Sequence, residues 1–304
     1  MMDWFSVNRH ILLRLLGTVL AVVLIILLIQ REGSSEIIGS LKEISLPFLM
    51  LALVSLLVSR VFVILRWYIL LRSAGVKIPF SRTTELTLTG LFASNYLPTT
   101  IGGDVVRLGG AMQLGFDRAI CLASIAADRV IGMAGMICAV PFGLIPAWSV
   151  LGHSAVQLVV IPRFFQRIKG FLHRTLQSFS IWLRQPGALL SAMLCTWGNM
   201  IFIFLSLYIL LRGLEEPVSF WLIAGIWSLA YFVTLIPISI NGYGVQELSL
   251  TFLFSQVAGV SSASSLAVAV LIRILFLVAS LPGAVFLPSA LAAMSRQNTD
   301  WPDP

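Results

Sequence analysis

The stretch that decides the fold runs over Asn95–Arg107 and reads NYLPTTIGGDVVR. Pro98 is expected to end a helix, because proline lacks the amide hydrogen and clashes with the preceding turn. The pair Gly102–Gly103 permits a sharp reversal of the chain. Asp104 is a good cap for a helix that restarts at Val105. This order of residues predicts a helix that breaks and then resumes within an apolar region.

A second stretch, Pro237–Glu247, reads PISINGYGVQE and has the same order of features. A proline stops the helix, Gly242 and Gly244 give the chain freedom to turn, and a new helix follows. Irregular backbone at membrane depth persists only where it is buried in protein or lines a wet cavity. The free amide hydrogens at the start of each resumed helix therefore favour an anion in such a cavity.

The composition around these two stretches is that of an integral membrane protein. Of the 304 residues, 58% are hydrophobic and 11% are charged, and the mean hydropathy is +0.97. An average soluble domain has roughly 25% charged residues, so a soluble protein is excluded. The excess of 20 Lys and Arg over 13 Asp and Glu fits cytoplasmic loops, and no nucleic-acid motif accompanies it. The scattered cysteines and histidines predict no metal site, and no cofactor is expected.

Apolar runs of about 20 residues are long enough to cross a bilayer. Seven spans are predicted, at 11–29, 46–71, 84–97, 119–148, 187–211, 220–236 and 266–287, with two broken or re-entrant segments at 102–114 and 242–257. The expected fold is therefore all-α and polytopic. Loop charges predict a multi-pass protein of the cytoplasmic membrane with its N-terminus in the cytoplasm. Residues 164–182, within the connector at 149–185, form either an amphipathic basic helix on the inner leaflet or a plain cytoplasmic connector.

The chain also contains an internal repeat, because YILLR at 68–72 recurs at 208–212. Further matches at similar shifts are Phe80 with Phe220, Leu97-Pro98 with Ile236-Pro237, Gly103 with Gly242, Leu122-Ala123 with Leu266-Ala267, Gly115 with Gly259, and Arg129 with Arg273. The loop after the first copy's YILLR is basic and the equivalent loop in the second copy is acidic, so the copies are predicted to be inverted. Inverted repeats with broken segments are typical of alternating-access transporters, whose substrate site lies near the midplane.

The repeat gives a predicted organisation of five parts. These are a first transmembrane helix with its outer loop (1–45), a first copy (46–148) with its broken segment (95–115), a cytoplasmic connector (149–185), a second copy (186–287) with its broken segment (236–258), and a polar tail (288–304).

Ionisable residues within or beside apolar segments indicate the ligand. Each costs at least ~2.5–3.5 kcal/mol at the bilayer centre, so each needs a partner or a purpose. The set comprises Arg60, Arg66, Arg107, Arg129 and Arg273 together with Asp104, Asp128 and Glu247, five arginines against three acids. This surplus predicts a bound anion, such as a lipid phosphate, held by Arg107, Arg129 and Arg273, while Asp104 and Glu247 orient the arginines. Two alternatives stay open: Asp128 pairs with an arginine across the bundle, and Arg66 snorkels to the inner face.

These residues resemble the pattern of the transmembrane-region family of lysylphosphatidylglycerol synthases, also called flippase-like or dolichol-phosphate-glucose-synthase-like membrane proteins. The matching positions are Arg66-Trp67, then Asn95, Pro98, Gly102, Gly103, Asp104 and Arg107, then Asp128-Arg129, then Pro237, Gly242, Gly244 and Glu247, and finally Arg273. The resemblance covers roughly residues 46–283. It departs from the pattern at 149–161, which is short for the extra span that many members have. The resemblance implies a helical bundle that moves a lipid between leaflets.

The predicted function is that of a flippase-like lipid translocase with an Arg-lined cavity at the midplane. Its predicted substrate-binding residues are Asn95, Pro98, Gly102, Gly103, Asp104, Arg107, Asp128, Arg129, Pro237, Gly242, Gly244, Glu247 and Arg273. No catalytic residue is predicted, and without an ATP-binding motif movement is passive, gradient-coupled or driven by removal of product. The alternatives are an enzyme acting on a lipid phosphate or lipid-linked sugar and an accessory subunit of a lipid synthase. Membrane lipids, a lipid-synthesising enzyme and a second copy of the chain are the candidate partners.

Overall fold

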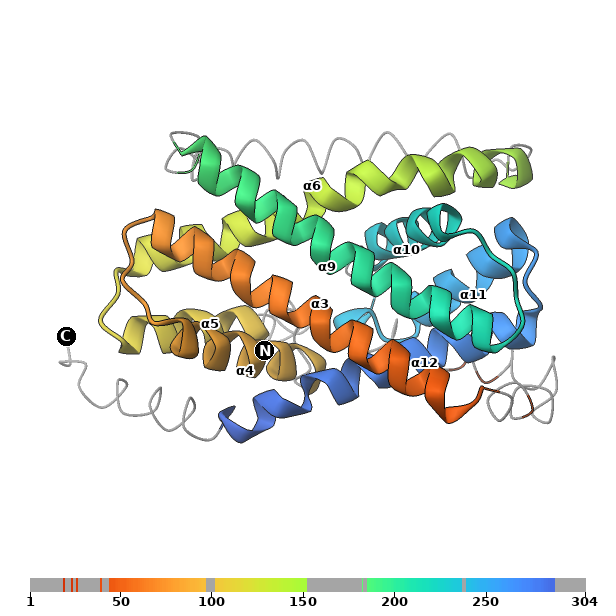
Figure 1. Cartoon of the computed structure of the whole chain (residues 1–304), viewed down its shortest axis with the longest axis horizontal. Helices are drawn as coiled ribbons and strands as arrows, with labels where there is room; N and C mark the ends of the chain where they lie inside the picture. The colour runs from red at the N-terminus through yellow and green to blue at the C-terminus, as the bar shows by residue number, and fades with distance from the viewer. Residues whose placement is uncertain are drawn as a thin grey trace, which may run out of the picture. The chain divides into compact units, whose positions relative to one another are not determined.

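The computed structural model describes residues 44–96, 102–151, 185–236 and 239–287, with isolated positions elsewhere. The elements in these ranges are all helical (Figure 1): α3 (Leu46–Ser73), α4 (Phe80–Tyr96), α5 (Gly102–Gln113), α6 (Arg118–Leu151), α9 (Pro186–Gly213), α10 (Phe220–Thr234), η2 (Ile240–Gly242), α11 (Val245–Ala258), α12 (Ser262–Ser280) and η3 (Leu281–Val285). Nearly all of the predicted first span, nearly all of the predicted connector and the polar tail lie outside the described residues.

Four helical stretches in the described ranges are long and apolar enough to cross a membrane: Leu46–Ser73, Arg118–Val150, Pro186–Gly213 and Ser262–Val285. The 28 residues of α3 give a helix about 42 Å long, against a hydrocarbon core about 30 Å thick. By contrast, α5 has 12 residues and α11 has 14, so they are about 18 and 21 Å long. The chain is therefore an integral membrane protein whose described ranges form helices, and the total of seven spans stays a prediction.

The chain forms two compact units. The α5 unit consists of Leu57–Met136, His153–Ile201 and Leu277–Pro304, and it contains α4, α5 and η3. The α11 unit consists of Met1–Leu56, Ile137–Gly152 and Phe202–Phe276, and it contains α10 and α11. The helices α3, α6, α9 and α12 each contribute one part to each unit, so within the described ranges the breaks between the units fall inside helices.

In the α5 unit, α4 packs directly against both α5 and η3, and Figure 1 shows α4 and α5 side by side. Glycines make this close approach possible. A Cβ atom added to Gly103 would lie 2.2 Å from the carbonyl oxygen of Gly90, and one added to Gly283 would lie 2.0 Å from the carbonyl oxygen of Leu88. Small residues at helix contacts are the usual device of membrane bundles, because lipid offers no hydrophobic drive to associate.

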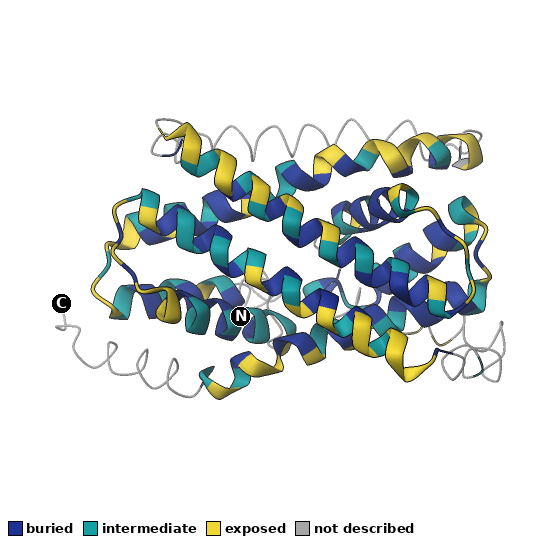
Figure 2. Cartoon of the chain, in the orientation of Figure 1, coloured by how far each residue is buried: buried dark blue, intermediate teal, exposed yellow. Residues whose placement is uncertain are grey.

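In the α11 unit, α10 packs against α11 and has most of its surface covered, as its mainly dark blue ribbon in Figure 2 shows. Its Gly225 meets Gly143 of α6 backbone to backbone. Serine hydroxyls join α3 to α9, because Ser55 donates to the carbonyl oxygen of Phe202 at 2.8 Å and Ser206 donates to that of Ala52 at 3.0 Å. The contacts in this unit are therefore also made by small residues and hydroxyl groups.

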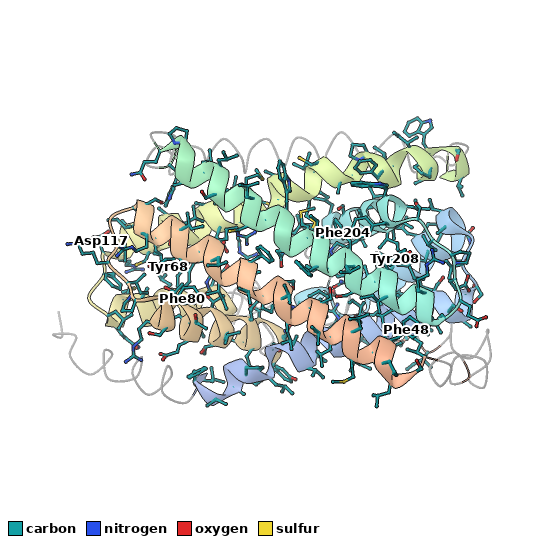
Figure 3. All side chains as sticks on the ribbon, viewed as in Figure 1. Phe48, Tyr68, Phe80, Asp117, Phe204 and Tyr208 are labelled. Carbon is teal, nitrogen blue, oxygen red and sulfur yellow. The ribbon has the colours of Figure 1, made fainter. Side chains whose placement is uncertain are left out.

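The connections after α3 and α9 have the same internal contacts. The ring of Tyr68 lies edge-on to Phe80 at 5.4 Å, and the ring of Tyr208 lies edge-on to Phe220 at 6.4 Å (Figure 3 labels the first pair and Tyr208). The amide of Val76 donates to the carbonyl oxygen of Leu71 at 3.0 Å, and the equivalent bond from Glu216 to Leu211 is 2.9 Å long.

Within these two turns, equivalent positions share a positive φ but hold different residues. Gly75 has φ 86°, and Glu215 has φ 59°. A side chain in this region costs roughly 1–2 kcal/mol, and glycine loses roughly 0.5–1 kcal/mol more backbone entropy on folding. Glu215→Gly is therefore expected to raise the free energy of unfolding by about 0.5–1 kcal/mol.

The reciprocal variant Gly75→Ala is expected to lower the same free energy by about 1 kcal/mol through conformation alone, because a Cβ at Gly75 would meet nothing within 4 Å. The measurement is an SDS-induced unfolding titration in detergent micelles. A Glu215→Gly variant less stable than the parent would contradict the expectation.

Candidate functional site

The α5 unit holds a row of alternating charges, and most of its members are buried. In it, Arg66 of α3 donates from Nε to Oδ1 of Asp128 at 2.6 Å. The Nη1 atom of Arg107 donates to Oδ2 of Asp128 at 3.1 Å and lies 3.7 Å from Oδ1 of Asp104. Arg129 closes the row, donating from Nε to Oδ2 of Asp104 at 2.5 Å. We call these five residues the α5 cluster.

The α5 cluster holds three arginines and two aspartates, so it has one positive charge in excess. Its inner members are well shielded: the side chains of Arg66, Arg107 and Asp128 are 10%, 9% and 5% exposed, whereas that of Arg129 is 46% exposed. Taking a charge out of water costs several kcal/mol unless a counter-charge accompanies it. The excess charge therefore makes the interior of the α5 cluster suitable for an anion.

Arg107 is the member of the α5 cluster that can bind such an anion. Its Nη1 atom is engaged by Asp128, but its Nε and Nη2 atoms are buried and find no hydrogen-bond acceptor within the described ranges. These two N–H groups lie on one edge of the guanidinium plane and together match two oxygens of a carboxylate or phosphate. Leaving buried donors unmet costs about 1–3 kcal/mol each, so a ligand that satisfies both is favoured.

Neighbouring side chains fix the position of Arg107. Its Cζ atom lies 4.1 Å from the ring centroid of Trp67, and the indole Nε1 of Trp67 donates to Ser124 at 3.1 Å. On α4, a Cβ atom at Gly90 would lie 2.8 Å from Cγ of Arg107. Gly90 therefore leaves space for the arginine stem, while the indole covers one face of the guanidinium group.

Two sequence-based expectations about this cluster are wrong, and one is confirmed. α5 begins at Gly102, so Asp104 is in the first turn of the helix and is not its cap. Arg66 is buried and paired, and it does not snorkel to the membrane face. The alternative that Asp128 pairs with an arginine across the bundle is confirmed, with two arginines in place of one. Trp67 was missed as a site residue, because its adjacency to Arg66 in sequence says nothing of stacking on Arg107.

The α11 unit has its own cluster around Arg273 of α12. The arginine donates from Nε to Oε1 of Glu247 and from Nη2 to Oε1 of Gln246 at 2.8 Å. Its Cζ atom lies 4.8 Å from the ring centroid of Tyr243. The other carboxylate oxygen of Glu247 accepts the amide of Gly244 at 2.7 Å. We call these five residues the α11 cluster.

The two clusters share one element, an acid–arginine pair at equivalent positions. Asp104 and Glu247 are each the third residue of a short helix, α5 and α11. Arg129 and Arg273 are each the twelfth residue of the helix that follows, α6 and α12. In both pairs the arginine donates through Nε. This agrees with the expectation that the acids orient the arginines.

The remaining predicted site residues are glycines, prolines and one asparagine. Gly102 and Gly103 are buried in the first turn of α5, and Asn95 is half-buried near the end of α4. Gly242 and Gly244 have φ 71° and 78°, so both use the conformational freedom that the sequence predicted. Pro98 and Pro237 lie outside the described residues. Among the described residues there is no group of three or more His, Cys, Asp or Glu arranged to hold a metal ion.

Comparison with known proteins gives one clear match. The family model described as the lysylphosphatidylglycerol synthase TM region matches residues 14–283. This range includes every residue of the α5 and α11 clusters. The comparison with curated proteins returned no match.

Proposed function

Because the chain belongs to the lysylphosphatidylglycerol synthase transmembrane-region family, we propose that it is a translocase that moves an anionic phospholipid or lipid-linked phosphate between leaflets. The observation that carries this proposal is the edge of Arg107 whose two N–H donors are buried and meet no acceptor in the described ranges. Two adjacent donors, buried in a cluster with one positive charge in excess, are suited to a phosphate. The acyl chains of the lipid would remain in the bilayer while the headgroup enters the protein.

The charge of the α5 cluster indicates which phosphate fits best. A phosphodiester carries one negative charge and two free oxygens, which matches one excess positive charge and two free donors. A phosphomonoester or diphosphate carries more negative charge than this cluster can neutralise. We therefore favour a diester-linked phospholipid as the substrate over a lipid monophosphate.

The recurrence of local structure supports an internal repeat, which is typical of alternating-access transporters. The edge-on Tyr–Phe pair, the turn after it and the acid–arginine pair all occur once in each half of the chain. The inverted orientation of the two copies rests on the loop charges alone. It predicts that the loop after Arg72 is cytoplasmic and that the loop after Arg212 is external.

The test is a translocation assay in vesicles of phosphatidylcholine containing fluorescent phosphatidylglycerol, with dithionite reporting the label exposed outside. Arg107→Gln is expected to slow translocation on the order of tenfold or more, because a charge-assisted contact contributes roughly 1.5–3 kcal/mol. The matched control is Arg82→Gln, which removes an arginine whose exposed side chain pairs with Glu85 only three positions away. Equal rates for Arg107→Gln and the parent, with both correctly folded, would overturn the proposal.

A further inference from the structure

The two copies of the repeat differ sharply at the positions that form the α5 cluster. The YILLR motifs are 140 positions apart, so the counterparts of Arg66 and Trp67 are Ser206 and Leu207. The two acids are 143 positions apart and the two arginines 144, so the counterparts of Arg107 and Asp128 are Leu250 and Ile272. These four counterparts are buried, with exposed fractions of 0%, 0%, 0% and 1%. The second copy therefore has a mostly apolar interior where the first copy has charged groups.

The contacts of Arg273 also differ from those of Arg107. Its three described contacts, to Glu247, Gln246 and Tyr243, all come from the turn that leads into α11 and from the first turn of that helix. Arg107, in contrast, has two donors without an acceptor in the described ranges. The guanidinium of Arg273, on α12, therefore holds the start of α11 in place.

Glu247 links that arginine to the backbone. One carboxylate oxygen binds Arg273, and the other accepts the amide hydrogen of Gly244, which precedes α11. The side chain of Glu247 is 8% exposed, so it needs a counter-charge to stay in this position. Removing the arginine leaves the buried carboxylate of Glu247 without its cation. This weakens the hydrogen bond between Glu247 and the Gly244 amide, which holds the start of α11 in position.

We infer that the lipid anion is held by the first copy alone, and that Arg273 is a positioning residue that fixes the start of α11. Both copies then contain the acid–arginine pair, but only the first copy also contains the charged residues that form the binding site. This inference rests on the proposed function for the identity of the ligand. The sequence predicts that Arg107, Arg129 and Arg273 all contact the anion, and this inference removes Arg273 from that set.

The test compares Arg107→Gln, Arg273→Gln and Arg273→Lys in the full chain. The probe is dihexanoylphosphatidylglycerol, a monomeric short-chain lipid, titrated against protein in zwitterionic detergent by calorimetry. Arg107→Gln is expected to raise the Kd at least tenfold, whereas Arg273→Gln leaves it within about twofold of the parent. Hydrogen exchange of residues 242–248 should be faster in Arg273→Gln and return towards the parent rate in Arg273→Lys.

An Arg273→Gln variant that loses affinity as much as Arg107→Gln, while its exchange over 242–248 stays unchanged, would overturn the inference. If Arg273→Gln fails to fold, Arg273→Lys decides the same question, because a ligand role predicts a raised Kd without faster exchange. If the parent does not bind the probe, or if Arg107→Gln binds it normally, the proposed function fails. The exchange result still decides the positioning role in that case.

Discussion

Asp128→Asn is expected to lower the free energy of unfolding by about 3–5 kcal/mol, because breaking a buried ion pair leaves an uncompensated charge. Asp128 is the shared partner of two buried guanidinium groups, those of Arg66 and Arg107. Asparagine has nearly the same shape, so the change removes the charge without opening a cavity. SDS-induced unfolding in detergent micelles measures the effect.

The matched control is Glu85→Gln, which breaks the ion pair with Arg82, whose side chain is 57% exposed. Solvent screens that pair, so the expected change is within about 1 kcal/mol. A second comparison is Arg66→Met combined with Asp128→Asn, which restores the net charge of the α5 cluster and should recover part of the lost stability. If the Asp128→Asn variant is as stable as the Glu85→Gln variant, the buried charges of Arg66 and Arg107 do not need the Asp128 carboxylate as their counter-charge.

Asp128→Asn also separates stability from binding. The substitution raises the excess positive charge of the α5 cluster from one to two, so the affinity for an anionic lipid should be retained or increased as stability falls. Arg107→Gln is expected to reduce binding instead. A loss of binding in both variants would mean that the geometry of Arg107 depends on Asp128 more than the charge balance does.

Some helix boundaries could be predicted closely because apolar runs and helix-breaking residues mark them directly, whereas α4 and α12 each begin four residues before the spans predicted from 84 and 266. The run from Leu46 was predicted as a span to residue 71, and α3 is a helix over Leu46–Ser73. The helix predicted to begin at Phe220 begins there in α10. The sequence predicts that the resumed helix starts at Val105, whereas α5 starts three residues earlier, at Gly102. Gly102 and Gly103 are helical because Gly103 packs onto the backbone of Gly90, and this contact between α4 and α5 is not visible in a local pattern.

The pairing of the charges could not be predicted, because partners in space lie far apart in sequence. Asp128 is 62 positions from Arg66 and 21 from Arg107. The eight ionisable residues in or beside apolar segments contain a surplus of two arginines over acids. The structure divides seven of these charges into an α5 cluster with one positive charge in excess and a balanced Glu247–Arg273 pair. The count over these residues could therefore indicate an anion but not which arginine would bind it.

Gly225→Ala is expected to lower the free energy of unfolding by about 3 kcal/mol. This is the upper end of the range of roughly 1–3 kcal/mol that adding a carbon to a packed interior costs. A Cβ at Gly225 would lie 1.9 Å from the amide nitrogen of Gly143 and 2.4 Å from its Cα. These are backbone atoms of α6, so no side chain can rotate out of the way, and α6 and α10 must move apart. Such a shift also breaks the contact of Phe142 with Trp221, whose ring centroids are 5.0 Å apart.

Gly187→Ala is the matched control for this clash. A Cβ at Gly187, near the start of α9, would meet nothing within 4 Å, and alanine is the better helix former. The control is therefore expected to be neutral or slightly stabilising in the same SDS titration. Gly143→Ala should match Gly225→Ala, because its Cβ would lie 2.5 Å from the carbonyl carbon of Gly225. If both substitutions prove as mild as the control, the two helices do not meet through their backbones.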